Sequence, residues 1–462
     1  MTTPIRQLLA LITKSVETIE VACQSSGTTV PDLRTPFTPP SEDFRANPEA
    51  AEAARIIAAA ALQLEAIVTP PFCHFVPIVN PPHCEFVWNR TSRRSYGLHV
   101  KDIAAKNGQD PEKLARFLRY LATHHVFREI SPNVFGHTRI SSMLDTHKSS
   151  AEIFADPEHK HDGTGGFPAL LAHFMDETFK ASAYAWETLS DPTTRSSGDP
   201  TECPFSRAIG RPEGLWTYFA RPEGQFQQHR FNIAMQAAKP ETILNGMPYD
   251  WGSLSPGSLV VDVGGGVGTL SLTLAAQFPQ LKFVVQDQEN VIEQGKKVWN
   301  EKMPNAISSG QVTLQDLCDS VHDFFTPQPQ TGAAVYLMKF ILHDWSTEYC
   351  IKILTQLSEA AAPTSTLLLL ERLLPLAVHD PETSEDGLQE APEPLLANYG
   401  GANDRGYMAD FVMFLMFNSQ ERTRKQFTDL LTRTGWEFVG VHRRPGGSGE
   451  IQCIEAKKAA AP

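Results

Sequence analysis

A glycine-rich turn between two apolar runs is the first feature of the sequence that could bind a ligand. The stretch LVVDVGGGVGTLSLTLAAQFPQLKFVVQD, from Leu259 to Asp287, predicts a strand, a turn, a helix and a second strand. Asp262 precedes the turn, and Asp287 ends the second strand, where it could accept hydrogen bonds from ribose hydroxyls. The residues that form the turn are Gly264, Gly265, Gly266 and Gly268. A unit of this kind holds a nucleotide-like ligand.

The spacing of these glycines bears on which ligand is bound. Dinucleotide sites use G-x-G-x-x-G, because a pyrophosphate lies on the N-terminus of the helix. Here Thr269 stands in place of the third glycine, and the spacing is G-x-G-x-G behind an acid. S-adenosylmethionine (SAM) has no phosphate but carries an ammonium, a carboxylate and a sulfonium, so an acid-led loop suits it better. A glycine turn can also exist merely to join a strand to a helix.

Three titratable residues follow strand or helix boundaries further along the chain. His343 comes after the apolar run 333–338, Glu371 ends the run TLLLL, and Glu421 is predicted to open a helix over 421–433. We expect the three side chains to converge on one rim, because ligands gather at the carboxyl ends of such strands. A hydroxyl on an aromatic ring has a pKa near ~10 and histidine near ~6.5, so a histidine in this position could remove that proton. Taken singly, each residue has a purely structural interpretation.

The elements that must position these residues form an α/β pattern. Helical segments lie between most of the apolar runs, which predicts a seven-stranded, Rossmann-like, mostly parallel sheet over 251–462. The runs are 259–263, 281–285, 311–314, 333–338, 365–370, 437–441 and 450–454. Residues 378–406, rich in acid, proline and glycine, predict a surface insertion. The aromatic-rich segment 151–250 predicts a helical linker that lines a substrate pocket.

Residues 1–150 predict a separate α-helical domain with a winged helix. The segments 5–19 and 47–68 have apolar helical faces, and 97–141 has the order of a helix-turn-helix with a wing. A winged helix can read DNA, but Lys113, Arg116 and Arg119 are set against acids, and the chain has a net charge of −13. We therefore expect a dimerisation domain and no nucleic-acid partner.

The composition is that of a globular protein. The chain has 462 residues, of which 41% are hydrophobic and 20% charged. Its 7 cysteines show no paired spacing, so they are expected to be reduced thiols of a cytoplasmic protein. The N-terminus lacks the pattern of a secretory signal, and the most apolar window is too short to span a bilayer. The sequence therefore predicts no membrane partner.

Several motifs in a fixed order carry a resemblance to a known family. These are the glycine turn, HDFFTPQP, LMKFILHDWSTEYCIKIL, LLLLERLLP and FNSQERTRKQFTDLLTRTGW. In this order they resemble the class I SAM-dependent O-methyltransferases of the plant caffeate and fungal secondary-metabolite type, with fungal members closest. The resemblance covers most of the chain and extends into the winged helix. It implies a homodimer that binds SAM and methylates a hydroxyl of a small aromatic or polyketide-type metabolite.

The resemblance also implies roles for individual residues. Asp262 and the glycines would line the SAM site, Asp287 would hold the ribose, Asp323 would lie by the adenine, and Lys339 would lie beside the cofactor. His343 matches the general base, and Glu371 and Glu421 match the two acids that flank it. Candidates for the substrate pocket are Phe174, Met175, Trp216, Phe219, Met235 and Asp344.

Two rival functions and one rival site are open to the sequence. Some fungal relatives use bound SAM only to assist pericyclic reactions, but they tend to lack the histidine and acids that are present here. A non-enzymatic winged-helix regulator is disfavoured by the negative charge. The pairs Cys73-His74 and His83-Cys84 could suggest a metal, but no metal site is predicted. They lie in 76–96 and its flank, a segment that departs from the family pattern.

Overall fold

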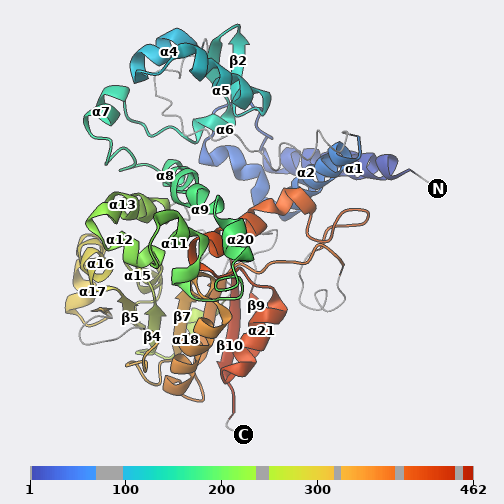
Figure 1. Ribbon diagram of the computed structural model, residues 1–462. Helices are drawn as coiled ribbons and strands as arrows, with labels where there is room; N and C mark the ends of the chain where they lie inside the picture. Colours follow the sequence, from blue (N-terminus) through green and yellow to red (C-terminus); the bar gives the residue numbers. More distant parts are fainter. Residues whose placement is uncertain are drawn as a thin grey trace. The chain divides into compact units, whose positions relative to one another are not determined.

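The computed structural model describes residues 3–68, 97–235, 249–316, 324–379, 390–442 and 451–460. The chain forms two compact units (Figure 1). The first comprises Met1–Lys180 and Leu215–Ala237, and the second Ala181–Gly214 and Ala238–Pro462. The boundary between them runs through 151–250, which the sequence analysis takes as one linker. Each unit is described by itself.

The first unit begins with two long helices that pack on each other. Helix α1 (Pro4–Ser26) and helix α2 (Pro48–Val68) are joined through the 3-10 helix η1 (Pro39–Ala46). Small side chains allow the helices to approach closely, because the shared core consists of Ile19, Ala22, Phe44, Ala50 and Ala53. Other large apolar side chains of this pair are exposed, among them Ile5, Leu9, Val16, Leu62 and Ile67. Only some of the apolar side chains of α1 and α2 are thus buried within the described part of the chain.

Residues 97–142 form a small module of helices and an antiparallel sheet. Asp110 caps the second helix, because its Oδ1 accepts a hydrogen bond from the backbone N–H of Lys113. The strands lie in the order β1-β3-β2, and their core with the helices includes Leu118 and Phe135. The elements are β1 (Leu98–His99), α4 (Val100–Asn107), α5 (Pro111–Thr123), β2 (Phe127–Ser131), β3 (Val134–His137) and α6 (Arg139–Ser142). The two helices and the two strands of the wing follow in the predicted order, whereas β1 and α6 are not predicted from the sequence.

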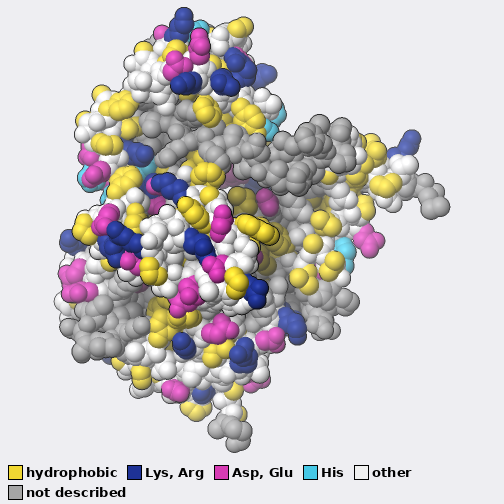
Figure 2. All heavy atoms as spheres, viewed as in Figure 1, with side chains coloured by type: hydrophobic (Ala, Val, Ile, Leu, Met, Phe, Trp, Pro, Cys, Tyr) yellow, Lys and Arg dark blue, Asp and Glu magenta, His cyan; other side chains and the backbone are white. Residues whose placement is uncertain are grey.

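Charge on this module is balanced rather than basic. Arg119 of α5 donates to Glu129 of β2 at 3.0 Å, so this guanidinium is turned toward the module's own sheet. Figure 2 shows side chains of both signs interspersed on the module, which lies at the top of the view. A DNA-reading helix would present unpaired basic residues along its exposed face.

The remainder of the first unit is helical. Helix α8 packs against α13 through Ala169, Ile233 and Ala234. A π-helical turn, η3, follows α8 and carries Asp176 and Glu177, both of which pair with the buried Arg230. The elements are α7 (Ser150–Ala155), α8 (Phe167–His173), η3 (Phe174–Thr178), α9 (Phe179–Ser182), α12 (Leu215–Phe219), η5 (Pro222–Gly224) and α13 (Gln225–Ala234).

A seven-stranded sheet forms the centre of the second unit and confirms the predicted fold class. The strand order is β6-β5-β4-β7-β8-β10-β9, and all pairs are parallel except those made by β10. The inner strands are mostly apolar, as is usual for parallel strands buried on both faces. Their bounds are β4 (Leu259–Val263), β5 (Lys282–Asp287), β6 (Val312–Asp316), β7 (Val335–Lys339), β8 (Thr366–Glu371), β9 (Trp436–His442) and β10 (Gln452–Lys458).

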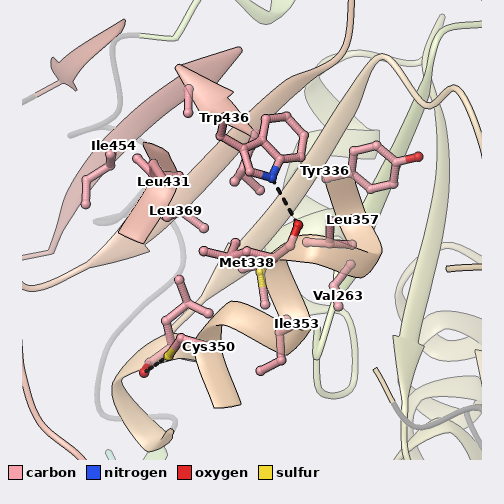
Figure 3. Packing of buried hydrophobic residues seen from close by; sticks show 14 of the residues in the cluster. Val263, Tyr336, Met338, Cys350, Ile353, Leu357, Leu369, Leu431, Trp436 and Ile454 are labelled. Atoms are coloured by element: carbon pink, nitrogen blue, oxygen red, sulfur yellow. Dashed lines mark hydrogen bonds between the residues drawn. The ribbon is translucent and has the colours of Figure 1, made fainter. Parts of the chain in front are cut away.

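Helices cover both faces of this sheet. One core lies under α18 and α21, where Trp436 donates from Nε1 to the carbonyl of Leu354 at 3.1 Å and packs among aliphatic side chains (Figure 3). The other lies under α15 and α16 and is centred on the buried Trp299. The helices are α10 (Ala185–Ser190), α11 (Pro204–Ile209), α15 (Thr269–Gln277), α16 (Glu289–Lys302), α17 (Pro304–Ser308), α18 (Thr347–Ala360), α20 (Asp404–Phe417) and α21 (Arg424–Arg433), with 3-10 turns η4 (Pro200–Glu202), η7 (Trp251–Ser253), η8 (Leu342–Asp344) and η9 (Gly400–Asn403).

Two predicted boundaries differ from the structure. The helix predicted over 421–433 begins at Arg424, because Thr423 caps it and exchanges hydrogen bonds with Gln426. Glu421 therefore precedes the helix and does not open it. The segment predicted as a surface insertion, 378–406, contains buried residues, because part of it packs into the unit before α20 begins. These residues are Ala391, Leu395, Ala397, Asn398, Tyr399 and Asn403.

Candidate active site

The glycine turn joins β4 to α15 and has one open side. Gly264, Gly266 and Gly268 have φ values of 69°, 61° and 77°, a left-handed conformation that favours glycine. A side chain at Gly265 would meet the Asp262 carboxyl carbon at 2.6 Å, so the turn is closed on that side. A Cβ at Gly266 would meet none of the described residues within 4 Å. The turn therefore offers backbone next to free space, as a ligand-binding loop requires.

Two carboxylates hold this turn, the buried Asp262 and the partly buried Asp287. Asp262 accepts a hydrogen bond from Ser271 Oγ at 2.6 Å, and burial raises its pKa to about 6. The carboxylate of Asp287 accepts hydrogen bonds from the backbone N–H groups of Gly266 and Gln288, each at 2.7 Å. Burial raises the pKa of Asp287 as well. Each carboxylate oxygen has two lone pairs, so both groups can still accept further hydrogen bonds. A cationic or hydroxyl-bearing ligand would satisfy them.

Lys339 brings a partly buried amino group to this part of the second unit. It ends β7, next to β4 in the sheet, and burial lowers its pKa, although Asp262 and Glu371 favour the charged form. Its Nζ lies 5.4 Å from the centroid of the Phe340 ring. Asp323, the predicted adenine contact, lies outside the described residues. The structure thus brings together Asp262, Asp287, Lys339 and the glycines.

His343 lies in a short turn, η8, directly after β7, and is fixed from both sides. Its Nδ1 is 3.2 Å from Glu421 Oε1, and its Nε2 is 3.4 Å from Asp344 Oδ1. Glu371 does not hydrogen-bond the ring. Its Oε1 instead accepts the backbone N–H groups of Ile341 and Leu342, at 3.1 and 2.9 Å. Glu371 therefore holds the turn, while Glu421 holds the imidazole.

The acids around His343 strongly favour its protonated form. Burial alone would lower its pKa, but the charges of Asp344, Glu371 and Glu421 and the hydrogen bond that the ring donates to Glu421 raise it to about 9. Burial raises the pKa of Asp344 to about 7 and also raises that of Glu371. Burial opposes ionisation of Glu421 too, yet His343 and Arg372 lower its pKa. Glu421 is thus held ionised beside the histidine, whereas the raised pKa of Asp344 favours its protonated form.

Two carboxylate oxygens in this site await a donor. The Oε2 atoms of Glu371 and Glu421 are buried and have no hydrogen-bond partner among the residues that the structure describes. Buried acceptors of this kind are usually satisfied by water or a ligand. The site therefore has unused capacity to accept hydrogen bonds.

The structure adds residues that the sequence analysis missed. Arg372 donates from Nη1 to Glu421 Oε1 at 2.9 Å, the same oxygen that faces His343. Phe340, at a positive φ of 53°, stacks on the His343 ring with centroids 5.0 Å apart. Arg422 donates to the carbonyl groups at both ends of the turn, and Ser419 donates to the carbonyl of His343. The only signal in the sequence is position, because Phe340, Arg372 and Arg422 directly follow the predicted site residues Lys339, Glu371 and Glu421.

The predicted pocket residues belong to different units. Asp344 lies in the site of the second unit. In the first unit, Trp216 and Phe219 each have ring centroids 5.5 Å from that of Phe231 and form an aromatic cluster. Phe219 is buried, Met175 is half-buried, and Phe174 and Met235 are exposed. Their predicted contact with the substrate remains a prediction.

A metal ion is the other ligand that the site's geometry allows. One atom each of His343, Glu371 and Glu421 lie within 4.8 Å of one another. However, Arg372 donates to the Glu421 oxygen that faces the ring, so a cation there would be set against a guanidinium. The arrangement is better suited to orienting an imidazole.

Comparisons with known proteins agree with this geometry. Residues 186–437 match the O-methyltransferase domain family. The chain is 47% identical to 4-O-methyltransferase 1 of Phanerochaete chrysosporium over 99% of both chains. Among solved structures, it is similar to a complex of LepI with SAM (TM-score 0.64, 17% identity, 88% of this chain and 94% of that one). It is also similar to a protein described as a pericyclic reaction enzyme (TM-score 0.64, 16% identity, 88% and 95%). At such identities the last two likenesses show the fold alone.

The sheet order and the acid-led glycine turn define a class I methyltransferase with SAM as its cofactor. The chain belongs to the O-methyltransferase family, as the sequence analysis predicts, and is a methyltransferase. In the described part of the chain, none of the helices combines the length and apolar character that a bilayer crossing needs.

Proposed function

We propose that the protein transfers the methyl group of SAM to a hydroxyl of a small aromatic or polyketide-type metabolite, with His343 as the general base. The observation that carries the proposal is the contact between His343 Nδ1 and the ionised Glu421 at 3.2 Å. This contact assigns a proton to Nδ1 and leaves the lone pair on Nε2 to accept the proton of the acceptor hydroxyl. The name of the Phanerochaete relative, 4-O-methyltransferase 1, supports an oxygen atom as the acceptor of the methyl group.

The residues of the cofactor loop fit SAM. The open side of Gly266 leaves room for the amino-acid tail, Asp262 offers a buried carboxylate for its ammonium, and Asp287 offers lone pairs for ribose hydroxyls. When bound, SAM supplies an electrophilic methyl group and leaves as S-adenosylhomocysteine. Lys339 contributes a partly buried amino group whose charged form Asp262 and Glu371 favour.

The chain's own residues manage one proton. As the acceptor oxygen attacks the methyl carbon, the hydroxyl proton passes to His343 Nε2, and the electron pair of the breaking carbon–sulfur bond stays on sulfur. Glu421 stabilises the imidazolium that results, and Glu371 keeps the turn in place through the N–H groups of Ile341 and Leu342. Asp344 lies beside Nε2 and, with its pKa near 7, can contact the acceptor as a donor or an acceptor.

Replacing His343 tests this mechanism. We expect His343→Ala to bind SAM almost unchanged but to release S-adenosylhomocysteine ~10²–10⁴-fold more slowly, the usual contribution of a general base. The native rate should rise with pH toward about 9, because the neutral ring is the base and the protonated ring is not. A Glu371→Gln variant should lose less, because the base remains. Equal release by the native and His343→Ala proteins, with a good phenolic acceptor, would remove His343 from the mechanism.

The alternative is a protein that binds SAM but catalyses a pericyclic reaction or none. The likeness to a pericyclic reaction enzyme is one of fold and does not distinguish the two. The intact set of His343, Asp344, Glu371 and Glu421 favours methyl transfer. Failure to form S-adenosylhomocysteine across a wide panel of phenols, polyketides and enols, in a protein that binds SAM, would favour the alternative.

We further propose a homodimer joined through α1 and α2 in the cytoplasm. The exposed apolar side chains of the helix pair support the dimer, and the described cysteines, all free thiols, support a reducing compartment. Light scattering at micromolar concentration tests the first, and a monomer would contradict it. Fluorescence microscopy of the tagged protein tests the second, and a secreted signal would contradict it.

A further inference from the structure

Two histidines and an aspartate gather on the first unit, and none of them belongs to the candidate active site. His159 and Asp162 lie in the loop before α8, and His229 lies in α13. One ring nitrogen of each histidine and a carboxylate oxygen of Asp162 lie within 4.8 Å of one another. His229 Nε2 is 2.7 Å from Asp162 Oδ1, and the two imidazole centroids are 5.5 Å apart.

We propose that His159, Asp162 and His229 bind a divalent transition-metal ion of the zinc class. Imidazole nitrogen and carboxylate oxygen are ligands of such ions, which they approach to ~2.0–2.2 Å in a tetrahedral arrangement. The three side chains are 55%, 41% and 45% exposed, so small rotations can close the remaining distance and water can take the fourth position. Both histidines bind as neutral rings and release any proton they carry.

A fourth residue already orients one of the ligands. The carboxylate of Asp156 lies 2.8 and 2.9 Å from His159 Nδ1. A hydrogen bond from Nδ1–H to a carboxylate fixes the tautomer and the ring orientation, and it leaves the Nε2 lone pair for a metal. Metal-binding histidines are usually held in this way.

The same loop contains a polar group that the described residues do not satisfy. His161 is 4% exposed, and neither of its ring nitrogens has a hydrogen-bond partner in the part of the chain that the structure describes. An unsatisfied buried imidazole is expected where a water or an ion completes the structure. This observation is independent of the three proposed ligands and points to the same loop.

A bound ion would tie together segments that are 67 residues apart in sequence. Helix α13 also carries Arg230, which pairs with Asp176 and Glu177 of the π-helical turn. The metal would therefore fasten the loop to a helix that is already fixed in the unit. We expect its effect to appear as stability of the protein, whatever its effect on catalysis.

The test measures metal binding and thermal unfolding of the full chain. After chelator treatment, the native protein is titrated with zinc chloride by calorimetry, and its unfolding temperature is measured with and without the metal. We expect His159→Gln and His229→Gln each to weaken one class of binding at least tenfold and to remove the zinc-dependent rise in unfolding temperature. Asp156→Asn should weaken the same binding ~10–100-fold, because it removes only the orienting partner.

The matched control is His379→Gln. His379 is also an exposed histidine paired with a carboxylate, Glu390 at 2.6 Å, but it has no second histidine beside it among the described residues. This variant should bind zinc like the native protein. Zinc bound at His343 or by residues 73–84 would remain bound in every variant, so it could not produce the loss of binding expected for His159→Gln and His229→Gln. Zinc binding that is the same in His159→Gln, His229→Gln and the native protein would overturn the proposal.

Discussion

At the scale of single residues, His343, the proposed general base, shares its partner with an arginine. Glu421 Oε1 faces His343 Nδ1 at 3.2 Å and Arg372 Nη1 at 2.9 Å. Both donors compete for one oxygen, so the arginine limits how strongly Glu421 can hold the imidazolium. A weaker hold makes the neutral, base-competent ring more available. Arg372 is thus a positioning residue that also moderates the basicity of His343.

We expect Arg372→Gln to shift the rising limb of the pH–rate profile to higher pH by about one unit. Without the guanidinium, Glu421 interacts with the histidine alone and the pKa of His343 rises further. The value of kcat/KM at a pH below that limb should fall about tenfold, because one pH unit is a tenfold change in the neutral fraction. Profiles of kcat/KM against pH for the two proteins measure the shift.

Arg372→Lys is the matched control, because it keeps the charge and should keep most of the native profile. The other charged groups near the ring, which stay the same in both variants, are Lys339, Asp344, Glu371, Asp410 and Arg422. A slower Arg372→Gln enzyme with an unshifted profile would contradict this role and point to a loss of structure alone.

The sequence predicts the main site residues but not their exact contacts. His343 and Glu371 could be placed because they directly follow apolar strands, whose carboxyl ends share one edge of the sheet. The contact of Glu371 with backbone N–H groups, rather than with the ring, depends on the conformation of a three-residue turn. The stacking of Phe340 depends on a positive φ, which no pattern of residue types reveals. Arg372 directly follows the apolar strand β8, and the sequence pattern does not indicate which carboxylate it pairs with.

At the scale of elements, the glycine turn makes a sharp test of cofactor binding. We expect Gly266→Asn to weaken the binding of S-adenosylhomocysteine at least tenfold, because its side chain would fill the open side of the turn. Asparagine tolerates the left-handed conformation that valine or alanine would strain, so the effect should be one of space and not of folding. Isothermal calorimetry on the folded variant measures the affinity.

Gly332→Asn provides the comparison. Gly332 has a similar φ of 64° and open space around its Cβ position, but it lies before β7 at the other end of the strand. This variant should bind S-adenosylhomocysteine like the native protein. If Gly266→Asn is folded and binds equally well, the cofactor does not lie at this turn.

Elements could be predicted where one physical signal dominated. The seven strands were found within a few residues because short apolar runs that alternate with helices are typical of buried parallel strands. The predicted start of α21 at Glu421 is wrong. An acid is favourable in the first turn of a helix, but Thr423 and Gln426 form a capping box, which starts the helix at Arg424. The segment 378–406 was taken for a surface insertion from its composition, which conceals how Leu395 and Tyr399 reach the interior.

At the scale of the whole molecule, the raised pKa of His343 links stability to pH. Its folded pKa of about 9 exceeds the unfolded value of ~6.5, so its contribution is fully present below pH ~6.5 and is lost as the pH rises through about 9. The difference corresponds to about 3 kcal/mol. We expect the free energy of unfolding to fall over this range and His343→Gln to flatten the fall.

Urea unfolding at a series of pH values measures this effect. His124→Gln removes an exposed ring that stacks on Tyr120 and should leave the slope unchanged. The same slope in His343→Gln as in the native protein would show that the histidine is not held in its charged form.

The order of the sheet also has a consequence for synthesis on the ribosome. Strand β10 is made after β9 but lies between β9 and β8, and it pairs with both along its length. While the chain is growing, β8 therefore presents an unpaired edge to the cell, and such an edge invites pairing with other chains. Translation at ~5–20 residues per second makes this exposure last for about a second or more. A chain that stops short of Gln452 keeps this edge open permanently, so premature termination there should yield aggregates rather than a smaller folded enzyme.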